Sequence, residues 1–300
     1  MKVLVKELKK CRICKSKKLS KFLDLDSMPL PNGFISEQDL KKSEEKYKLS
    51  CLFCEDCGLV QLSNVVNPSL MFKNYVYVPS VSKVMMNNFS NLSFQTFKEI
   101  QLNKNSLVVD IGSNDESLLT FFKNYGTRVL GVDPAKNLVK VARMRGIPSE
   151  ARLFSLKSAK ILRQRYGSAD LITATNVVAH VDNLHDFFEG ISHLLSEKGA
   201  FATEFPYIVD LIRKNEFDTI YHEHLSYFSL KPWVKLVESH GFEIVSAQRL
   251  SIHGGSLRLV HKRKGVSFNY GRNTVNFLIW KKRHYSFHRL SIQSMYINLC

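Results

Sequence analysis

Two pairs of cysteines carry the clearest chemical signal in this 300-residue chain. Cys11 and Cys14 form one C-x-x-C pair, Cys54 and Cys57 form a second, and 39 residues separate the pairs. Each pair can turn tightly enough to direct two thiolates at one ion, and two such knuckles complete a tetrahedral Zn²⁺ site without an open coordination position. The spacing therefore predicts a structural zinc site. Free buried thiols or a redox pair are the alternatives, and Cys51, three residues before Cys54, is interpreted as a spectator.

A second cluster of reactive side chains is the stretch Tyr221-His-Glu-His224. His180, which follows a predicted strand, is expected to join it above the sheet. A histidine beside a carboxylate can act as a base near neutral pH, and a tyrosine hydroxyl can stabilise an enolate oxygen. The residue types thus predict acid–base catalysis. A metal site and a solvated helix start are the alternatives, although the two histidines of the stretch do not have H-E-x-x-H spacing.

These side chains need a scaffold, and the central region alternates strands and helices as an α/β domain does. The sequence predicts buried strands at residues 107–111, 128–132, 169–174 and 200–204, a short element near Pro148, and helices at about 116–124 and 184–195. This order predicts a doubly wound parallel sheet. Ligands of such sheets bind at the carboxyl ends of the strands.

Three residues at those strand ends predict an adenosine site. Asp110 ends the first strand, Gly112 opens the following turn, and Asp133 ends the second strand. An acid at the end of strand two can bond ribose hydroxyls, and a glycine lets a ligand approach the backbone. Dinucleotide enzymes and S-adenosylmethionine (SAM) methyltransferases share this pattern, but a single glycine counts against the dinucleotide fingerprint. The alternative is that the strand-end acid only caps the next helix.

The segment Ser251–Arg258 contains Gly254-Gly255 followed by Ser256. Backbone N–H groups at the glycines, together with the Arg258 guanidinium, can cradle a phosphate. A Gly-Gly hairpin turn is the alternative, and the segment alone favours it.

The chain carries a formal net charge of +16, which at first suggests a nucleic-acid partner. The charge lies at the two ends: residues 1–22 hold nine Lys/Arg and one acid, and residues 244–300 hold ten Lys/Arg and no acid. The region between is nearly neutral, so nucleic acid is not the favoured partner. The chain contains no run of about 18 uncharged apolar residues, so no membrane span is predicted. The amino-terminal segment lacks the apolar core of a secretory signal. We therefore expect a cytoplasmic protein with reduced thiols.

Taken together, these motifs resemble those of the zinc-containing, SAM-dependent C-methyltransferases that act on nucleotide-linked deoxysugars. The resembling stretches follow the family's order over about residues 11–260: Cys11-x-x-Cys14, Met28-Pro-Leu-Pro-Asn32, Cys54-x-x-Cys57-Gly-Leu-Val-Gln-Leu62, Tyr75-Val-Tyr77, Val109-Asp-Ile-Gly-Ser-Asn-Asp115, Gly131-Val-Asp-Pro-Ala135, Asn176-Val-Val-Ala-His180, Glu216-Phe-Asp-Thr-Ile-Tyr-His-Glu-His224 and His253-Gly-Gly-Ser-Leu-Arg258.

The resemblance implies methylation of a carbon next to the 4-keto group of a nucleotide-linked sugar, typically carried on dTDP. A base removes the proton alpha to the ketone, and the enolate attacks the SAM methyl group. The resemblance implies that His224 is the base and that Glu223 is its neighbour. Tyr221, His180 and Tyr75 would orient the sugar or stabilise the enolate oxygen.

The resemblance also implies binding residues. The SAM site would comprise Asp110, Gly112, Asn114, Asp133 and Asn176. The nucleotide-sugar would meet the residues of the glycine-rich segment, which are His253, Gly254, Gly255, Ser256 and Arg258.

The expected organisation is a zinc-binding module over residues 1–70, a class I (Rossmann-like) SAM-methyltransferase domain over 71–245, and the start of a sugar-binding domain over 246–300. Two departures from the family pattern stand out. Glu116 occupies the position of a family glycine, where its bulk and charge are expected to lie near the SAM carboxylate. The resemblance also fades after about residue 264, which we interpret as a truncated or replaced carboxyl-terminal domain.

Overall fold

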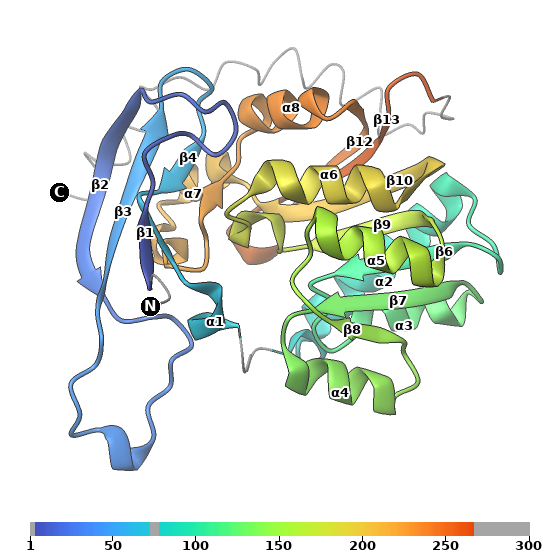
Figure 1. The fold of residues 1–300 in the computed structure, drawn as a ribbon, viewed down its shortest axis with the longest axis horizontal. Coiled ribbons are helices and arrows are strands. Elements are labelled where there is room, and N and C mark those ends of the chain that lie inside the picture. Colours follow the sequence, from blue (N-terminus) through green and yellow to red (C-terminus); the bar gives the residue numbers. More distant parts are fainter. Residues whose placement is uncertain (1–3, 73–77, 267–300) are drawn as a thin grey trace.

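A seven-stranded sheet forms the centre of the molecule in the computed structural model, which describes residues 4–72 and 78–266 (Figure 1). Its strand order is β12-β13-β10-β9-β6-β7-β8. The strands are β6 (Leu107–Ile111), β7 (Arg128–Asp133), β8 (Ser149–Ala151), β9 (Ala169–Thr175), β10 (Leu195–Pro206), β12 (Phe242–Leu250) and β13 (Ser256–Arg263). The five adjacent strands β8, β7, β6, β9 and β10 run parallel to one another. Strand β13 is antiparallel to both of its neighbours, β10 and β12. The predicted α/β class with a doubly wound sheet is confirmed.

Apolar side chains alternate between the two faces of the sheet, and helices cover both faces. Val108 and Leu171 face one hydrophobic cluster, whereas Val109 and Ile172 face the other. This alternation follows from the two-residue period of a strand, and burial of both faces explains why the predicted strands are almost wholly apolar.

The helices divide between these two clusters. On the first face lie α2 (Lys83–Ile100) and α3 (Ser117–Asn124). On the second lie α5 (Leu156–Tyr166), α6 (Leu184–Leu194) and α8 (Leu230–Ser239). Helix α4 (Lys136–Met144) contacts the edge strand β8 and its neighbour β7. In the part of the chain that the structure describes, no helix is both long enough and apolar enough to cross a membrane.

A second, four-stranded sheet forms the amino-terminal module, on the left in Figure 1. Its order is β11-β4-β3-β2, with β2 (Leu19–Met28), β3 (Tyr47–Cys54) and β4 (Val60–Leu62) from the amino-terminal region. The fourth strand, β11 (Ser226–Tyr227), comes from a segment more than 160 residues later and pairs antiparallel with β4. A separate ribbon joins β1 (Val5–Glu7) to β5 (Asn64–Val66). The module is therefore completed by the chain that follows β10.

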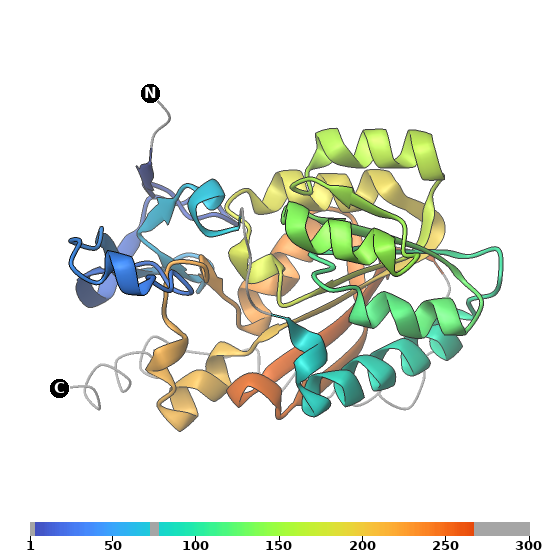
Figure 2. The same ribbon diagram turned by 90° about the horizontal axis from the view of Figure 1, so that it is seen from below.

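Both sheets share one hydrophobic core. The larger cluster of buried residues runs from Cys11 and Leu49 in the module to Phe205 and Trp233 beside the central sheet. Figure 2 shows the module packed against one end of the central sheet, with α7 (Ile208–Lys214) and the β11 segment at the junction. The junction is thus a packed interior and not a flexible linker.

The two expected domain boundaries, after residues 70 and 245, both fall within secondary-structure elements. The one after residue 70 lies within α1 (Pro68–Met71). The one after residue 245 lies inside β12, and β13 pairs with β10 at the middle of the central sheet. Residues 246–250 and 256–263 are therefore strand residues of the central sheet. Residues 267–300, where the replaced or truncated end was predicted, lie outside the described residues.

A buried ion pair links two strands of the central sheet and is hydrogen-bonded to a side chain of α2. Arg258 of β13 lies with its Nε 2.9 Å from an oxygen of Glu204 on β10, and the side chains are 5% and 0% exposed. Asn88 of α2 donates to the other Glu204 oxygen at 2.8 Å and accepts from the Arg258 guanidinium at 2.7 Å. Every carboxylate oxygen of Glu204 therefore has a donor, which is the condition under which a buried charge is tolerated.

Replacing Arg258 by Met should destabilise the fold by about 3–5 kcal/mol, because it leaves the Glu204 carboxylate buried without its charge partner. Urea denaturation followed by circular dichroism measures this loss. The control is Arg165→Met, which removes an exposed partner of Glu150 and should leave the unfolding midpoint near that of the wild type. Equal midpoints for the two variants would contradict a structural role for Arg258.

Candidate active site and metal centre

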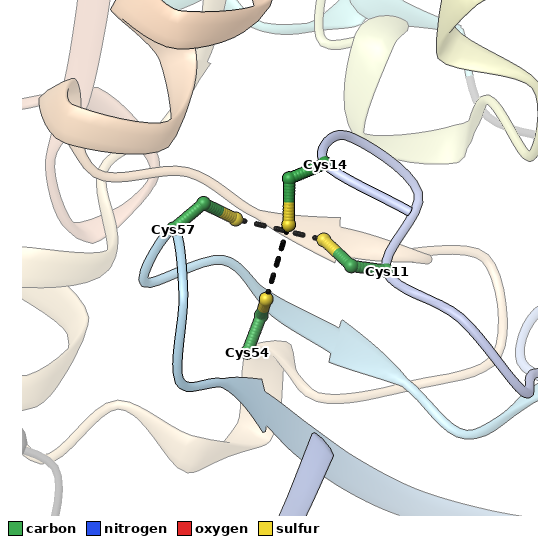
Figure 3. Close-up of side chains that lie close together, drawn as sticks. All are labelled: Cys11, Cys14, Cys54 and Cys57. Carbon is green, nitrogen blue, oxygen red and sulfur yellow. Dashed lines mark hydrogen bonds between the residues drawn. The ribbon is translucent and has the colours of Figure 1, made fainter. Parts of the chain in front are cut away.

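The four predicted cysteine ligands meet at one point of the amino-terminal module (Figure 3). Their sulfur atoms all lie within 4.8 Å of one another. The closest approaches are 3.5 Å between Cys11 and Cys57 and 3.4 Å between Cys14 and Cys54. Zinc–sulfur bonds of ~2.3 Å in a tetrahedron place sulfurs about 3.8 Å apart. The donor set and its spacing therefore fit one Zn²⁺ with four thiolate ligands.

Tight turns aim the sulfurs inward. In the second knuckle the Gly58 N–H donates to the Cys54 carbonyl at 2.8 Å, and Gly58 adopts φ 80°. This left-handed conformation is costly for residues with a Cβ, which explains the glycine directly after Cys57. Cys51 is fully buried on β3 outside the cluster, and burial raises the pKa of its thiol to about 12. Its place agrees with the predicted spectator role.

A cavity of about 850 Å³ opens at the carboxyl ends of the parallel strands and extends to the amino-terminal module. The module contributes Asn32, Pro68 and Phe72 to its lining. The structure brings most of the predicted catalytic and binding residues to this one cavity: Asp110, Gly112, Asn114, Asp133, Asn176, His180, Tyr221, His224, His253 and Gly254 line it. Tyr75, which is predicted to act on the sugar, lies outside the described residues.

The turn after β6 forms one wall of the cavity. Gly112 has φ 67°, and a Cβ at this position would overlap the Val177 side chain, so the residue must be glycine on two counts. Asp133 at the end of β7 accepts hydrogen bonds from the Asn114 N–H at 2.9 Å and the Ala135 N–H at 2.8 Å. The carboxylate thus holds this turn and the residue Ala135 that precedes α4, but it does not cap that helix. Asp133 also lines the cavity.

His224 lies at the opposite wall in a defined tautomer. Its Nδ1 is 2.8 Å from the Thr219 carbonyl oxygen, and a carbonyl can only accept, so Nδ1 carries the proton. Nε2 is then the acceptor of the Tyr221 hydroxyl at 2.9 Å. Burial lowers the pKa of His224 to about 4, so the ring is neutral near pH 7. The site therefore presents an unprotonated ring nitrogen to the cavity.

His180 and Glu223 complete the polar group. The His180 ring lies edge-on to the His224 ring, with 5.0 Å between centroids, and burial lowers the pKa of His180 to about 3. Glu223 is only 1% exposed, and one of its oxygens is 3.8 Å from His180 Nδ1. The other oxygen accepts from Asn32 Nδ2 at 2.9 Å. Glu223 therefore lies behind His180, with Asn32 of the β2–β3 loop as its donor.

The residues of the glycine-rich segment do not all reach the cavity. His253 and Gly254 line it, whereas Ser256 is fully buried in β13 and the Arg258 guanidinium is engaged by Glu204 and Asn88. Gly255 also lies outside the lining, and its carbonyl accepts a hydrogen bond from the Tyr207 N–H at 2.9 Å. The predicted phosphate contact from Arg258 conflicts with this placement, because its guanidinium compensates a buried carboxylate. The hairpin turn, which was the alternative, joins β12 to β13.

Glu116 does not lie where its bulk was expected. Its side chain is fully buried beneath the turn, is absent from the cavity lining, and accepts from the Ser113 and Ser149 hydroxyls at 2.9 Å each. A Cβ at position 131 would overlap its carboxylate, so Gly131 of β7 makes the room. Glu116 keeps φ 65°, the conformation that a glycine adopts without strain. Burial raises the pKa of its carboxyl from 4.5 to about 8.

Sequence reasoning assigned no role to Asn32 or Arg12. Asn32 lies in the Met28–Asn32 stretch that carried part of the resemblance, so its position was marked without its function. Arg12, between the first two cysteines, is 3% exposed and pairs with Asp182, a lining residue of the cavity. No sequence pattern pointed to that contact, because its two partners are 170 residues apart.

The fold and the cavity define an α/β domain of the class I methyltransferase type joined to a four-cysteine module. Two family models match the chain in agreement with this: "Putative zinc binding domain" over residues 11–72 and "Methyltransferase domain" over residues 86–247. The second match covers more than half of the chain, and the chain belongs to this methyltransferase family.

Among curated proteins, the chain is similar to the C-methyltransferase NovU of Streptomyces niveus, with 35% identity over 257 residues. The match covers 86% of this chain and 61% of NovU, so the chain spans less than two thirds of the length of that relative.

Solved structures with a similar fold include two methyltransferases. The magnesium protoporphyrin IX methyltransferase ChlM of Synechocystis, with bound SAH, matches at TM-score 0.47 and 16% identity, over 64% of this chain and 90% of that one. An S-adenosylmethionine-dependent methyltransferase of Clostridium acetobutylicum matches at TM-score 0.48 and 14% identity, over 60% and 92% of the two chains.

Replacing Cys54 by Ser should abolish stable zinc binding and lower the melting temperature, because it removes one of the four ligands through which the metal holds the two knuckles together. Metal analysis of the purified protein measures the zinc content, with one equivalent expected for the wild type. Cys51→Ser is the matched control, since it changes a buried thiol outside the cluster and should retain the equivalent of zinc. Equal zinc loss in both variants would contradict the four-sulfur site.

Replacing Glu116 by Gln should flatten the decline of stability with pH. A carboxyl whose pKa is raised from 4.5 to about 8 binds its proton more tightly in the folded chain, so stability falls as pH rises from about 4.5 to about 8. One such group contributes at most about 1.4 kcal/mol per pH unit. Urea denaturation between pH 5 and 8 measures the slope. The exposed Glu197→Gln control should keep the wild-type slope, and an unchanged slope in the Glu116 variant would contradict the shifted pKa.

Proposed function

We propose that this protein is a SAM-dependent C-methyltransferase that methylates a carbon alpha to the 4-keto group of a nucleotide-linked, dTDP-type deoxysugar. The observation that carries the proposal is the position of His224 Nε2. This unprotonated nitrogen, hydrogen-bonded to Tyr221, lines the same cavity as the β6 turn and Asp133. A base and a cofactor-type loop therefore meet across one enclosed space.

The cofactor end of the cavity has the features that an adenosyl ligand needs. Gly112 allows a close backbone approach, and Asp133 at the end of β7 can bond ribose hydroxyls. Asn176 lines the cavity, and its side-chain oxygen has no hydrogen-bond partner among the described residues, so it can accept from a ligand's ammonium group. We assign Asp110, Gly112, Asn114, Asp133 and Asn176 to SAM, which supplies an electrophilic methyl group when bound.

The opposite wall supplies the proton chemistry. His224 Nε2 takes the proton from the carbon alpha to the ketone, and the electron pair left behind moves onto the ketone oxygen. With SAM bound, the carbonyl would re-form as this carbon takes the methyl group, while the bond between the methyl group and the SAM sulfur would break and leave S-adenosylhomocysteine. His224 would then release the proton to solvent. The neutral state of His224 suits this role, because a base must be unprotonated before the reaction begins.

Tyr221 stabilises the enolate oxygen. Its hydroxyl now donates to His224 Nε2, so a bound ketone must attract that hydroxyl and thereby free the nitrogen for the proton. His180 orients the sugar beside it, Glu223 lies behind His180 as its neighbour, and Asn32 holds Glu223 from the module side. We extend the sugar-orienting role to Tyr75 and the substrate contacts to His253 and Gly254. The similarity to NovU, a C-methyltransferase, supports transfer to carbon.

Replacing His224 by Gln should lower the methyl-transfer rate by about 10²–10⁴-fold while SAM still binds, because a general base is removed and the cofactor wall is intact. Mass spectrometry with a dTDP-4-keto-6-deoxyhexose measures product, and calorimetry measures SAM binding. His193→Gln is the control, since His193 lies outside the cavity lining.

Absence of SAM binding by the wild type at millimolar concentration would contradict the methyltransferase proposal. SAM binding without turnover of any 4-keto sugar nucleotide would reduce it to a cofactor-binding relative. Full activity of the His224 variant would overturn the assignment of the base.

A further inference from the structure

The two residues between the first cysteines do not serve the metal cluster alone. Arg12 contacts the connection between β9 and α6, which forms part of the cavity lining, and Ile13 contacts His185 in the first turn of α6. This connection includes Asn176, His180 and Asp182. The first zinc knuckle is therefore in direct contact with the segment that carries two of the proposed site residues.

Arg12 is held by its charge partner. The Arg12 side chain is 1% exposed, and its Nε lies 3.3 Å from Asp182 Oδ1. Its Nη1 donates to the Leu62 carbonyl at 3.2 Å, whereas Nη2 has no hydrogen-bond partner among the described residues. A buried guanidinium needs a nearby carboxylate, so Asp182 is constrained to remain beside the knuckle. Lys6, which is 64% exposed, binds the other Asp182 oxygen at 3.0 Å from solvent.

Ile13 contacts the first turn of α6 through its backbone carbonyl. The Ile13 carbonyl lies 2.8 Å from His185 Nε2, which must therefore donate. His185 Nδ1 then accepts from His240 Nε2 at 2.9 Å, at the end of α8. Because His185 is the second residue of α6, the knuckle contacts the first turn of this helix, whose start is capped by the Asn183 side chain.

Between these anchors Val178 and Ala179 are buried in the shared hydrophobic core. At the start of the segment the Asn176 N–H donates to the Glu204 carbonyl at 2.7 Å, and Asn176 has φ 57°. The single 3₁₀ turn Val178–His180 follows. Its far end is tied to the knuckle through Asp182 and His185.

We propose that the first zinc knuckle positions the β9–α6 segment through Arg12 and Ile13, and thereby sets the affinity of the cavity for SAM. This inference rests on the proposed function for its ligand. Arg12 is a positioning residue here, because it touches Asp182 and is not itself part of the cavity lining. The zinc ion stabilises the turn that presents both contacts.

The test compares three variants of the full chain. Arg12→Met removes the buried partner of Asp182, and Lys6→Met is the matched control that removes the exposed partner of the same carboxylate. His185→Ala breaks the second anchor at a half-buried residue outside the cavity lining, so it reports even if the Arg12 variant does not fold. Calorimetry measures the SAM dissociation constant, metal analysis the zinc content, and hydrogen exchange the protection of amides 176–185.

We expect the SAM dissociation constant to rise about tenfold in Arg12→Met and by a smaller factor in His185→Ala, with one equivalent of zinc retained. Exchange of amides 176–185 should accelerate in both variants, and Lys6→Met should resemble the wild type in every measurement. In an Asp182→Asn background, Arg12→Met should cause little further loss of affinity, because the interaction is already broken.

Wild-type SAM affinity and wild-type exchange in both Arg12→Met and His185→Ala would overturn the inference. Loss of affinity only together with zinc, or full additivity with Asp182→Asn, would also overturn it, since the effect would not pass through Asp182. A wild-type protein that binds no SAM would contradict the proposed function, and the exchange measurement would still decide whether the knuckle positions the segment.

Discussion

The pairing of β11 with β4 is the interaction on which the arrangement of the site depends. Ser226 and Tyr227 pair with Gln61 and Val60, so a segment that leaves the central sheet becomes an edge strand of the amino-terminal module. The Tyr221–His224 stretch immediately precedes this strand and is thereby held at the junction of the two sheets. Without the pairing, His224 would lie on a long surface connection with no fixed relation to the cavity.

The side chains of that stretch point to different parts of the molecule. Tyr221 and His224 face the cavity and bond to each other, three residues apart along a turn. His222 instead points to the module, with its Nε2 2.9 Å from the Tyr47 carbonyl of β3. The motif therefore fastens the two parts of the molecule together and presents a reactive pair. His222 and Glu223 are buried with hydrogen-bond partners from distant parts of the chain, whereas Tyr221 and His224 bond to each other.

Burial governs the electrostatics of the cavity. It lowers the pKa values of His180 and His224 and raises the pKa of Asp110 to about 7. In each case the charged form is disfavoured because water is excluded. A cavity with these properties keeps its bases neutral and is suited to a cationic ligand, since the acids beside the β6 turn gain stability as carboxylates when a positive charge binds. The separation of a neutral basic wall from an acidic wall matches the two ends of a SAM-dependent methyl transfer.

The sequence by itself determined the four zinc ligands, the positions of the central parallel strands along the chain and the residues at their carboxyl ends. These features depend on local spacing and on the apolar run of each strand, which short stretches of chain encode. Only the tertiary structure decided which of the predicted site residues share the cavity. Arg258 is in a family motif, yet it lies in β13 beside Glu204, because a buried carboxylate from another strand requires its charge. Glu116 lies beneath the turn because Gly131 and Ser149 of neighbouring strands make room and hydrogen bonds for it. The contacts of Asn32, Arg12 and Asp182 are with partners more than 160 residues away in the sequence. Such contacts depend on how the two sheets pack together, and no local sequence pattern contains that information.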